Sequence, residues 1–239
     1  MQDADDLPDV IQTSSGRILS TLNWLRAGVL GSNDGIISTA AIIFGVAGAS
    51  AQHSTLILAG IAAIAAGALS MAAGEYVSVS TQRDLELAEL ERQKFDLESD
   101  PERELQVLAR LFEQRGVTPN IALEVSRQMS AKDALSVHAR AELGIDPEAV
   151  TNPWVAALAS LLAFTLGGLV PIIPVVIAPP DLAIWISGIA VVIALALTGG
   201  IAARLGHMPA APSIARNVIG GILAVGITYG VGMIAATRL

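Results

Sequence analysis

Four side chains in two apolar segments have the types and the spacing to bind a cation. Asn33 and Asp34 lie in the stretch GSNDGIIS, and the run 35–74 that follows contains no Asp, Glu, Lys or Arg. Met71 and Glu75 are four residues apart, which places them on one face of a helix. A thioether beside carboxylates favours a transition metal over Mg²⁺ or Ca²⁺, which prefer oxygen ligands. These four residues are therefore the predicted membrane pathway for a metal ion.

The apolar surroundings of Asp34 make this acid a candidate functional residue. An acid within a membrane segment costs several kcal/mol on some scales and is by default a functional hypothesis. The alternative is an acid at the membrane interface that snorkels or caps a helix. Gly31 and Gly35 flank it. They permit either a close approach of another helix or local unwinding that frees carbonyls as ligands, and the sequence leaves both open.

A second set of candidate ligands lies in the segment 80–152, which holds fifteen of the twenty-two acids. Carboxylates crowded together repel one another unless a cation or protons lie among them. His138 and Glu142 are four apart and offer an imidazole and a carboxylate to one ion. The alternative is that these acids are only the solvated faces of surface helices. The candidate metal ligands are Glu89, Asp96, Glu98, Glu102, Glu104, His138 and Glu142.

The elements that must position these residues are long apolar helices. The chain is 53% hydrophobic and 15% charged, against about 25% charged in a typical soluble domain. A bilayer core needs about 20 apolar residues as a helix. The run 35–74 is too long for one span, and the polar hexapeptide SAQHST divides it. The predicted spans are roughly 27–48, 55–79, 154–178, 182–203 and 215–237.

Basic residues orient these spans. Of fourteen Lys and Arg, only Arg238 falls on the side opposite the rest, so the N-terminus and the segment between spans 2 and 3 are predicted to be cytoplasmic. The fold class is an all-α membrane protein with five transmembrane helices and an acidic cytoplasmic helical domain inserted between helices 2 and 3. The predicted parts are a disordered acidic tail (1–21), transmembrane helices 1–2 (22–80), the cytoplasmic metal-binding domain (81–150) and transmembrane helices 3–5 (151–239).

Start and stop signals divide the inserted segment into helices. The first helix continues the second span, and Asp100-Pro101 then reads as an N-cap followed by proline at the first helical position. That helix ends at Gly116, Thr118-Pro119 starts another, and AKDALSVHARAEL forms a last helix that ends at Gly144.

Several functions are excluded or disfavoured by what the sequence lacks. No cysteine is present, so a metal site must use oxygen, imidazole or thioether ligands. No GxxxxGK[ST] motif occurs, which argues against ATP hydrolysis. The acidic N-terminus, MQDADDLPD, is no secretory signal. We expect a protein that is not an enzyme, has no catalytic cofactor and binds no nucleic acid.

The order and combination of these motifs resemble the vacuolar iron transporter family. The resemblance covers nearly the whole chain from Leu22. It rests on N-D-G in span 1, A-G-A-L-S-M-A-A-G-E-Y in span 2, the acidic insert ending H-A-R-A-E-L-G, and L-G-G-L-V-P-I-I-P in span 3. The family implies a five-span homodimer with its metal path at the subunit interface. It also implies a cytoplasmic domain that gathers ferrous iron, and export from the cytosol coupled to protons.

Carried over by position, the resemblance implies pathway roles for Asp34 and Met71, with Glu75 as an addition, and metal binding in the 93–107 helices and at His138 with Glu142. The chain departs from the family pattern where an acid or methionine is expected. Ala63, Gln93 and Val107 stand at positions of expected acids, and His138 stands at that of a methionine. Asp96 and Glu104 are retained, and Glu89, Glu98 and Glu102 are candidate substitutes.

The sequence thus predicts a secondary transporter that moves Fe²⁺, and Mn²⁺, Zn²⁺ or Co²⁺, out of the cytosol by proton antiport. A membrane-anchored metal sensor or scaffold and a divalent cation channel are the alternatives. The bilayer, a second copy of the chain, metal ions and protons are the expected partners. A bacterial plasma (inner) membrane is the expected location.

Overall fold

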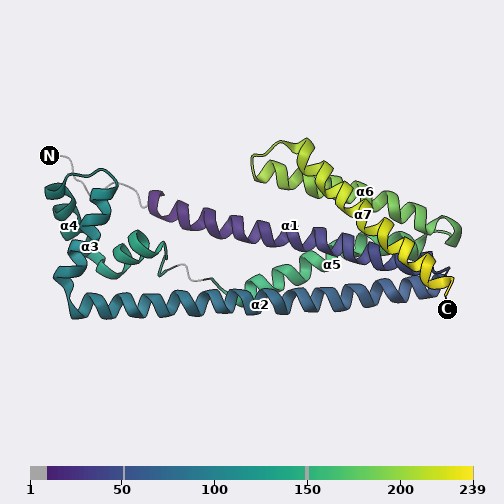
Figure 1. The fold of residues 1–239 in the computed structure, drawn as a ribbon, viewed down its shortest axis with the longest axis horizontal. Coiled ribbons are helices and arrows are strands. Elements are labelled where there is room, and N and C mark those ends of the chain that lie inside the picture. Colours follow the sequence, from purple (N-terminus) through teal and green to yellow (C-terminus); the bar gives the residue numbers. More distant parts are fainter. Residues whose placement is uncertain (1–9, 51, 149–150, 239) are drawn as a thin grey trace. The chain divides into compact units, whose positions relative to one another are not determined.

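The computed structural model describes residues 10–50, 52–148 and 151–238, with side chains from residue 28 onward. Within these ranges all regular secondary structure is helical, which confirms the prediction of an all-α chain. The elements are α1 (Val10–Gly48), α2 (His53–Ser99), α3 (Pro101–Gln114), α4 (Pro119–His138), the π-helical turn η2 (Ala139–Leu143), α5 (Pro153–Ile177), α6 (Pro180–Leu205) and α7 (Ala210–Ala236), as Figure 1 shows.

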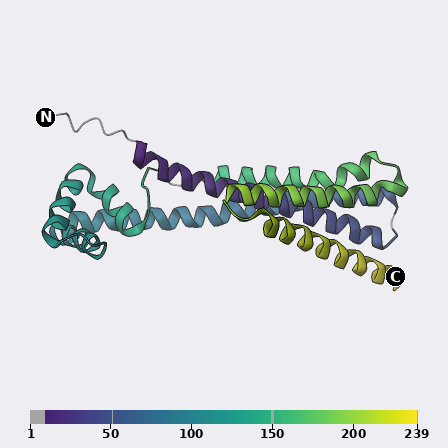
Figure 2. The same ribbon diagram turned by 90° about the horizontal axis from the view of Figure 1, so that it is seen from above.

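The chain forms two compact units. We call residues 21–76 and 154–239 the bundle unit, and residues 77–153 together with 1–20 the insert unit. The long helices α1 and α2 contribute residues to both units. Within the bundle unit, α5, α6 and α7 run beside α1, as the views in Figures 1 and 2 agree.

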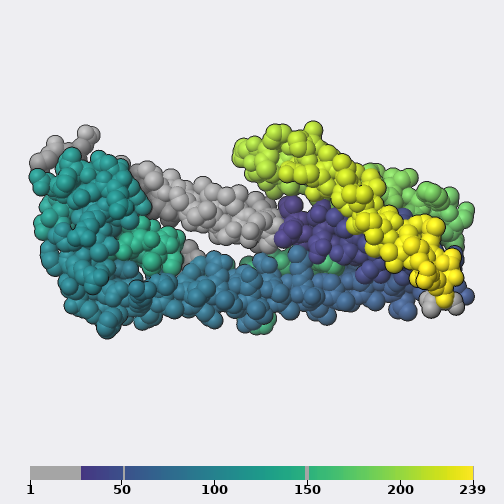
Figure 3. Space-filling model, in the orientation of Figure 1, coloured from purple at the N-terminus to yellow at the C-terminus, as the bar shows by residue number. Residues whose placement is uncertain are grey.

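Five helices are long and apolar enough to cross a membrane, judged by length and composition. They are Gly28–Gly48, His53–Ser99, Pro153–Ile177, Pro180–Leu205 and Ala210–Ala236, with mean hydropathies of 1.5 to 2.3 in their most apolar windows. Large apolar side chains on these helices face outward. Trp185 is 74% exposed and Ile177 is 77% exposed. The helix α7, yellow in Figure 3, lies on the visible outer surface of the bundle unit. Such a surface suits hydrocarbon rather than water.

The core of the bundle unit forms around α1. Ile36 and Ala40, four residues apart, pack with Val191 and Leu195 of α6. One turn further, Ile43 packs in a second cluster whose other buried members are Leu56, Ile172 and Val175. Because the buried residues of α1 recur at helical spacing, one face of this helix meets several neighbours at once.

Glycines bring α1 and α5 into backbone contact. A Cβ atom at Gly35 would collide with the carbonyl oxygen of Phe164 and lie 3.0 Å from the backbone nitrogen of Gly168. On the other helix, a Cβ atom at Gly167 would collide with the carbonyl oxygen of Ser32. α1 stays helical through this region. The role of these glycines is therefore close helix approach rather than unwinding.

Capping signals set the helix ends in the insert unit as the sequence predicted. The Asp100 carboxylate accepts a hydrogen bond from the Arg103 amide at 3.1 Å, and Pro101 occupies the first turn of α3. Gly116 follows the end of this helix with φ +95°. Gly144, with φ +70°, ends η2 and donates its amide to the Ala139 carbonyl. Glycine tolerates this left-handed conformation without a Cβ penalty.

Asp133 breaks α4 in two. Its backbone leaves the helical region (φ −159°, ψ 90°), and its carboxylate accepts a hydrogen bond from the Ser136 amide at 3.1 Å. Asp133 therefore acts as an N-cap for the helical segment that continues into η2. This break agrees with the separate last helix that the sequence predicted.

The first helix starts earlier than the sequence suggested. Residues 10–21 were expected to belong to a disordered tail, but α1 already begins at Val10. Extending an existing helix costs far less than nucleating one, so the first span can propagate towards the N-terminus. Residues 1–9 of the predicted tail lie outside the described residues.

The Gly35 contact yields a test. We expect Gly35→Ala to destabilise the protein by about 1–3 kcal/mol, because the added methyl meets rigid backbone of α5. Gly226→Ala in α7 is the matched control, since a Cβ there has no neighbour within 4 Å and alanine favours helix by up to about 1 kcal/mol. Thermal unfolding in detergent should show a lower Tm for the first variant only. Equal Tm values would contradict the backbone contact.

Candidate metal site

Two carboxylates and one imidazole converge in the insert unit. Glu104 of α3, His138 at the end of α4 and Glu142 of η2 each offer a ligand atom, and these atoms all lie within 4.8 Å of one another. His138 is fully buried, and Glu104 is 8% exposed. The Glu142 side chain is 16% exposed. Among the side chains that the structure describes, this is the one group of three acids or histidines close enough to share a metal ion. We call it the EHE cluster.

The local helix geometry places the two C-terminal members together. The helix runs on from α4 into η2 without interruption, so residues four apart share a face. The His138 Nδ1 and Glu142 Oε1 atoms are 2.6 Å apart. η2 is a turn with i→i+5 spacing, a rare form that often marks functional sites. Packing of α3 against α4 and η2 then brings Glu104 to this pair.

Two further polar side chains hold the cluster. Gln93 of α2 is buried, and its Nε2 donates to Glu104 Oε2 at 3.2 Å. The Ser130 hydroxyl lies 3.4 Å from His138 Nε2. With an ionised Glu142, the hydrogen bonds assign the proton to Nδ1, which leaves Nε2 to face the Ser130 hydroxyl. Each member of the cluster therefore has a described partner that orients it.

Neither of these two supporting residues was predicted from the sequence to hold the cluster. From the sequence, Gln93 was only a position at which the family resemblance leads one to expect an acid. Yet Gln93 lies between Leu90 and Leu97 at spacings of three and four, so it is a polar residue within an apolar helical stripe. That pattern indicates a buried amide with a specific partner. Ser130 has no comparable signal, because its neighbour His138 is reached only through the break at Asp133.

The other predicted ligands of the insert unit lie away from the EHE cluster. Glu89 and Asp96 both approach Arg92, with N–O distances of 3.9 and 4.0 Å. Glu98 and Glu102 are exposed. The structure therefore brings together three of the seven predicted ligands and leaves four on the surface.

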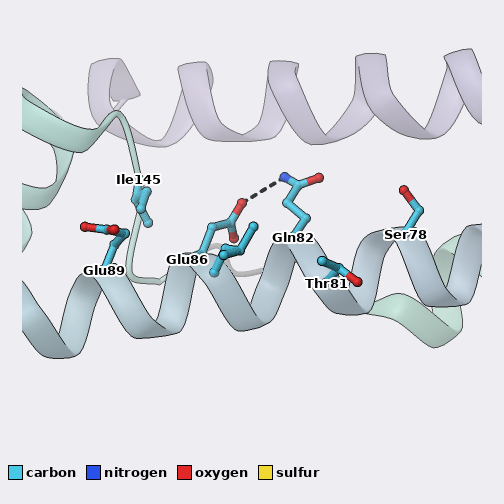
Figure 4. Close-up of a pocket in the computed structure, with 7 residues that line it drawn as sticks. Ser78, Thr81, Gln82, Glu86, Glu89 and Ile145 are labelled. Atoms are coloured by element: carbon cyan, nitrogen blue, oxygen red, sulfur yellow. Dashed lines mark hydrogen bonds between the residues drawn. The ribbon is translucent and has the colours of Figure 1, made fainter.

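An open groove runs along α2 in the same unit, and Figure 4 shows it. In it the Glu86 carboxylate accepts a hydrogen bond from Gln82 at 2.8 Å, and Glu89 lies near Ile145. The lining residues are Ser78, Thr81, Gln82, Leu85, Glu86, Glu89 and Ile145. The groove contains none of the EHE cluster.

In the bundle unit, neighbouring residues of α1 face three directions. Asn33 is half-buried, and its Oδ1 accepts a long hydrogen bond from Thr198 of α6 at 3.5 Å. Gly35 is buried against α5. Asp34, between them, is exposed, and its Oδ1 accepts a hydrogen bond from Ser38 at 3.1 Å. Asp34 thus points away from α5 and α6, whereas Asn33 is used in a contact between helices.

The remaining pathway candidates lie on α2. Met71 and Glu75 are both half-buried and share a helical face, as their spacing predicted. Gly74 beside them is exposed, and a Cβ atom there would have no neighbour within 4 Å. This part of α2 therefore leaves open space next to Glu75.

Five apolar helices, an acid on the exposed face of the first, and a buried carboxylate–imidazole cluster outside the apolar segments define a class. It is that of helical membrane proteins with side chains that could hold a metal ion. A model of the VIT family matches residues 25–233. The chain belongs to this family, and together with its apolar helices this makes it an integral membrane protein.

Related proteins match over most of their length. A "Vacuolar iron transporter" of Acanthamoeba castellanii is 42% identical over 92% of this chain and 81% of its own length. "Vacuolar iron transporter homolog 5" of Oryza sativa subsp. japonica is 36% identical over 87% of this chain and 78% of its own. "Vacuolar iron transporter homolog 2" of Arabidopsis thaliana is 33% identical over 87% and 82%.

The His138–Glu142 pair yields a test of stability without metal. We expect Glu142→Ala to cost about 1–3 kcal/mol, because the buried Nδ1–H group of His138 loses its acceptor. Glu113→Ala is the control, since Glu113 is an exposed acid of α3. Thermal unfolding measured in the presence of a chelator should show a lower Tm for the first variant only. If both variants unfold like the wild type, the pair does not stabilise the fold.

Proposed function

We propose that this chain is a secondary transporter that moves Fe²⁺, and Mn²⁺ or related divalent transition metals, out of the cytosol in exchange for protons. The observation that carries the proposal is the buried EHE cluster in a chain with five candidate membrane spans. Carboxylate and imidazole ligands suit first-row divalent metals. The relatives named as iron transporters support iron as a cargo. In this scheme metal is bound substrate, and the protein needs neither ATP nor a catalytic cofactor.

The proposed layout follows from the charges. Five helices cross the bilayer, the N-terminus and the insert unit face the cytosol, and the C-terminus lies outside, because all Lys and Arg except Arg238 then lie on the inner side. A bacterial plasma membrane stays the predicted location. The three relatives described above come from an amoeba and from plants, so the membrane is a prediction separate from the family.

The exposure of Asp34 supports a homodimer. Asp34 lies within the candidate span Gly28–Gly48, and in the single chain its side chain is exposed. An ionised carboxylate that faces hydrocarbon is costly. A second copy that places its own α1 against this face removes Asp34 from lipid and encloses a path between the subunits. Leu30 and Ile42, which are 60% and 44% exposed, would share this interface.

The transport step follows from competition for the same oxygens. Metal binding requires deprotonated ligands, so loading a metal releases protons and proton binding releases metal. We assign this exchange to Asp34 and Glu75, with Met71 as an additional, soft ligand. The EHE cluster collects metal on the cytosolic side. The exposed acids Glu98 and Glu102 raise the local concentration of cations around it.

The first test replaces the acid of α1. We expect Asp34→Asn to abolish metal flux in proteoliposomes, because asparagine keeps the shape but does not neutralise a dication. Asp181→Asn, an exposed acid in the first turn of α6, is the control and should transport normally. The variant should still run as the wild-type oligomer on size-exclusion chromatography. Normal flux through Asp34→Asn would refute the pathway.

The same assay separates the three functions. An antiporter moves metal against its gradient when a pH gradient is imposed across the vesicle. A channel for divalent cations carries flux only down the metal gradient, without proton counterflow. A membrane-anchored sensor or scaffold binds metal at the insert unit but gives no flux.

A second test concerns the thioether. Met71→Leu is nearly isosteric, so folding should be retained. We expect weaker discrimination of Fe²⁺ against Mg²⁺ and Ca²⁺ in the membrane pathway, because among Asp34, Met71 and Glu75 only the sulfur of Met71 favours the softer ion. Met233→Leu, an exposed position of α7, is the control. Unchanged competition by the hard ions in the flux assay would make Met71 a packing residue.

A further inference from the structure

We propose that the EHE cluster is a one-ion site in which His138 determines selectivity. It accepts divalent metals that bind imidazole well, namely Fe²⁺, Co²⁺, Ni²⁺ and Zn²⁺, and discriminates against Mn²⁺, Mg²⁺ and Ca²⁺. This inference rests on the proposed function, because it takes the cluster as the cytosolic loading site. It narrows the cargo of that site.

Charge limits the cluster to one ion. Glu104 and Glu142 carry two negative charges, while a neutral imidazole and the Gln93 amide carry none. One dication therefore neutralises the group. A second would leave two uncompensated positive charges among side chains of which Glu104 and His138 are less than a tenth exposed, and a buried unpaired charge is strongly unfavourable. The surface acids do not change this count, because among the described side chains no further acid or histidine joins this group.

The reach of the ligand atoms also fits a single ion. Ligand atoms at about 2.1 Å from a transition metal lie at most about 4.2 Å apart. The three atoms of the cluster already lie within 4.8 Å of one another. Small side-chain movements therefore suffice to bind an ion. Gln93 is a positioning residue here, because its bond to Glu104 Oε2 leaves the other carboxylate oxygen for the metal.

The imidazole supplies the selectivity. Carboxylate oxygens alone suit Mg²⁺, Ca²⁺ and Mn²⁺, whereas imidazole nitrogen favours the later first-row metals, in the order Mn²⁺ < Fe²⁺ < Co²⁺ < Ni²⁺. His138 is fully buried and held by Glu142 and Ser130 on its two nitrogens. A hydrogen-bonded carboxylate raises the basicity of an imidazole ligand and fixes its orientation. The site therefore presents one imidazole nitrogen, which Mg²⁺ and Ca²⁺ disfavour and which Mn²⁺ binds less strongly than the later first-row metals do.

The test measures the affinities of the full-length protein in detergent for Co²⁺ and Mn²⁺ by competition titration. We expect His138→Gln, which keeps size and offers an oxygen, to lower the Co²⁺/Mn²⁺ affinity ratio at least tenfold. His207→Gln is the matched control, because His207 is an exposed histidine in the turn between α6 and α7. It should keep the wild-type ratio. An unchanged ratio in His138→Gln, or a second tightly bound ion at the cluster in the wild type, overturns the proposal.

A measurement on the wild type covers the case in which the variant does not fold. Pulsed EPR of protein loaded with less than one equivalent of Co²⁺, an ion that the cluster is proposed to favour, should show coupling to an imidazole ¹⁴N nucleus, in the wild type and in His207→Gln alike. The absence of this coupling overturns the proposal without any variant of His138.

Binding and transport outcomes separate this inference from the proposed function. If the protein transports metal but binds Co²⁺ and Mn²⁺ equally at the cluster, the proposed selectivity is wrong and the proposed transport function is unaffected. If the protein has the selective site but gives no flux in proteoliposomes, the proposed transport function is wrong and the proposed site is unaffected.

Discussion

Charge in a low-dielectric environment is the constraint on which the described architecture depends. A buried or lipid-facing carboxylate is tolerated only when a hydrogen bond, an opposite charge or a bound ion compensates it. The insert unit meets this condition inside one chain, where Glu142 bonds to His138 and Glu104 accepts from Gln93. The bundle unit does not, because Asp34 is exposed on a candidate span and, among the side chains that the structure describes, only the Ser38 hydroxyl is bonded to it. This difference is the physical reason for proposing that a second subunit completes the membrane path but not the EHE cluster.

The three residues of the N-D-G motif lie on three different faces of α1. Asn33 contacts α6, Gly35 contacts the α5 backbone, and Asp34 is left to face outward. Successive helical residues differ by about 100°, so three adjacent positions necessarily point in different directions. The close fit of Gly35 holds the rotation of α1 about its axis, and that rotation decides where Asp34 points. In the single chain the motif is thus one exposed acid between two residues that contact neighbouring helices.

The EHE cluster shows how a helix break can bring distant residues together. Asp133 caps a new helical segment, and that segment carries His138 and Glu142 to α3. Without the break, Ser130 and His138 would be two helical turns apart on a straight helix. With it, the Ser130 hydroxyl lies 3.4 Å from the imidazole. The surrounding acids remain on the surface, where they are suited to attracting cations rather than to holding one.

The sequence by itself determined the helical class, the long apolar helices and the family. Apolar periodicity, caps such as Asp100 and terminal glycines such as Gly144 act over a few residues, so they can be read without the fold. It also identified His138 and Glu142 as a pair, because residues four apart on a helix are neighbours. Only the tertiary structure decided which of seven candidate ligands converge, since Glu104 is 34 residues from His138 and meets it through helix packing. Likewise, the Gln93–Glu104 bond, the Ser130 contact and the outward direction of Asp34 depend on how helices pack, and no local pattern encodes that packing.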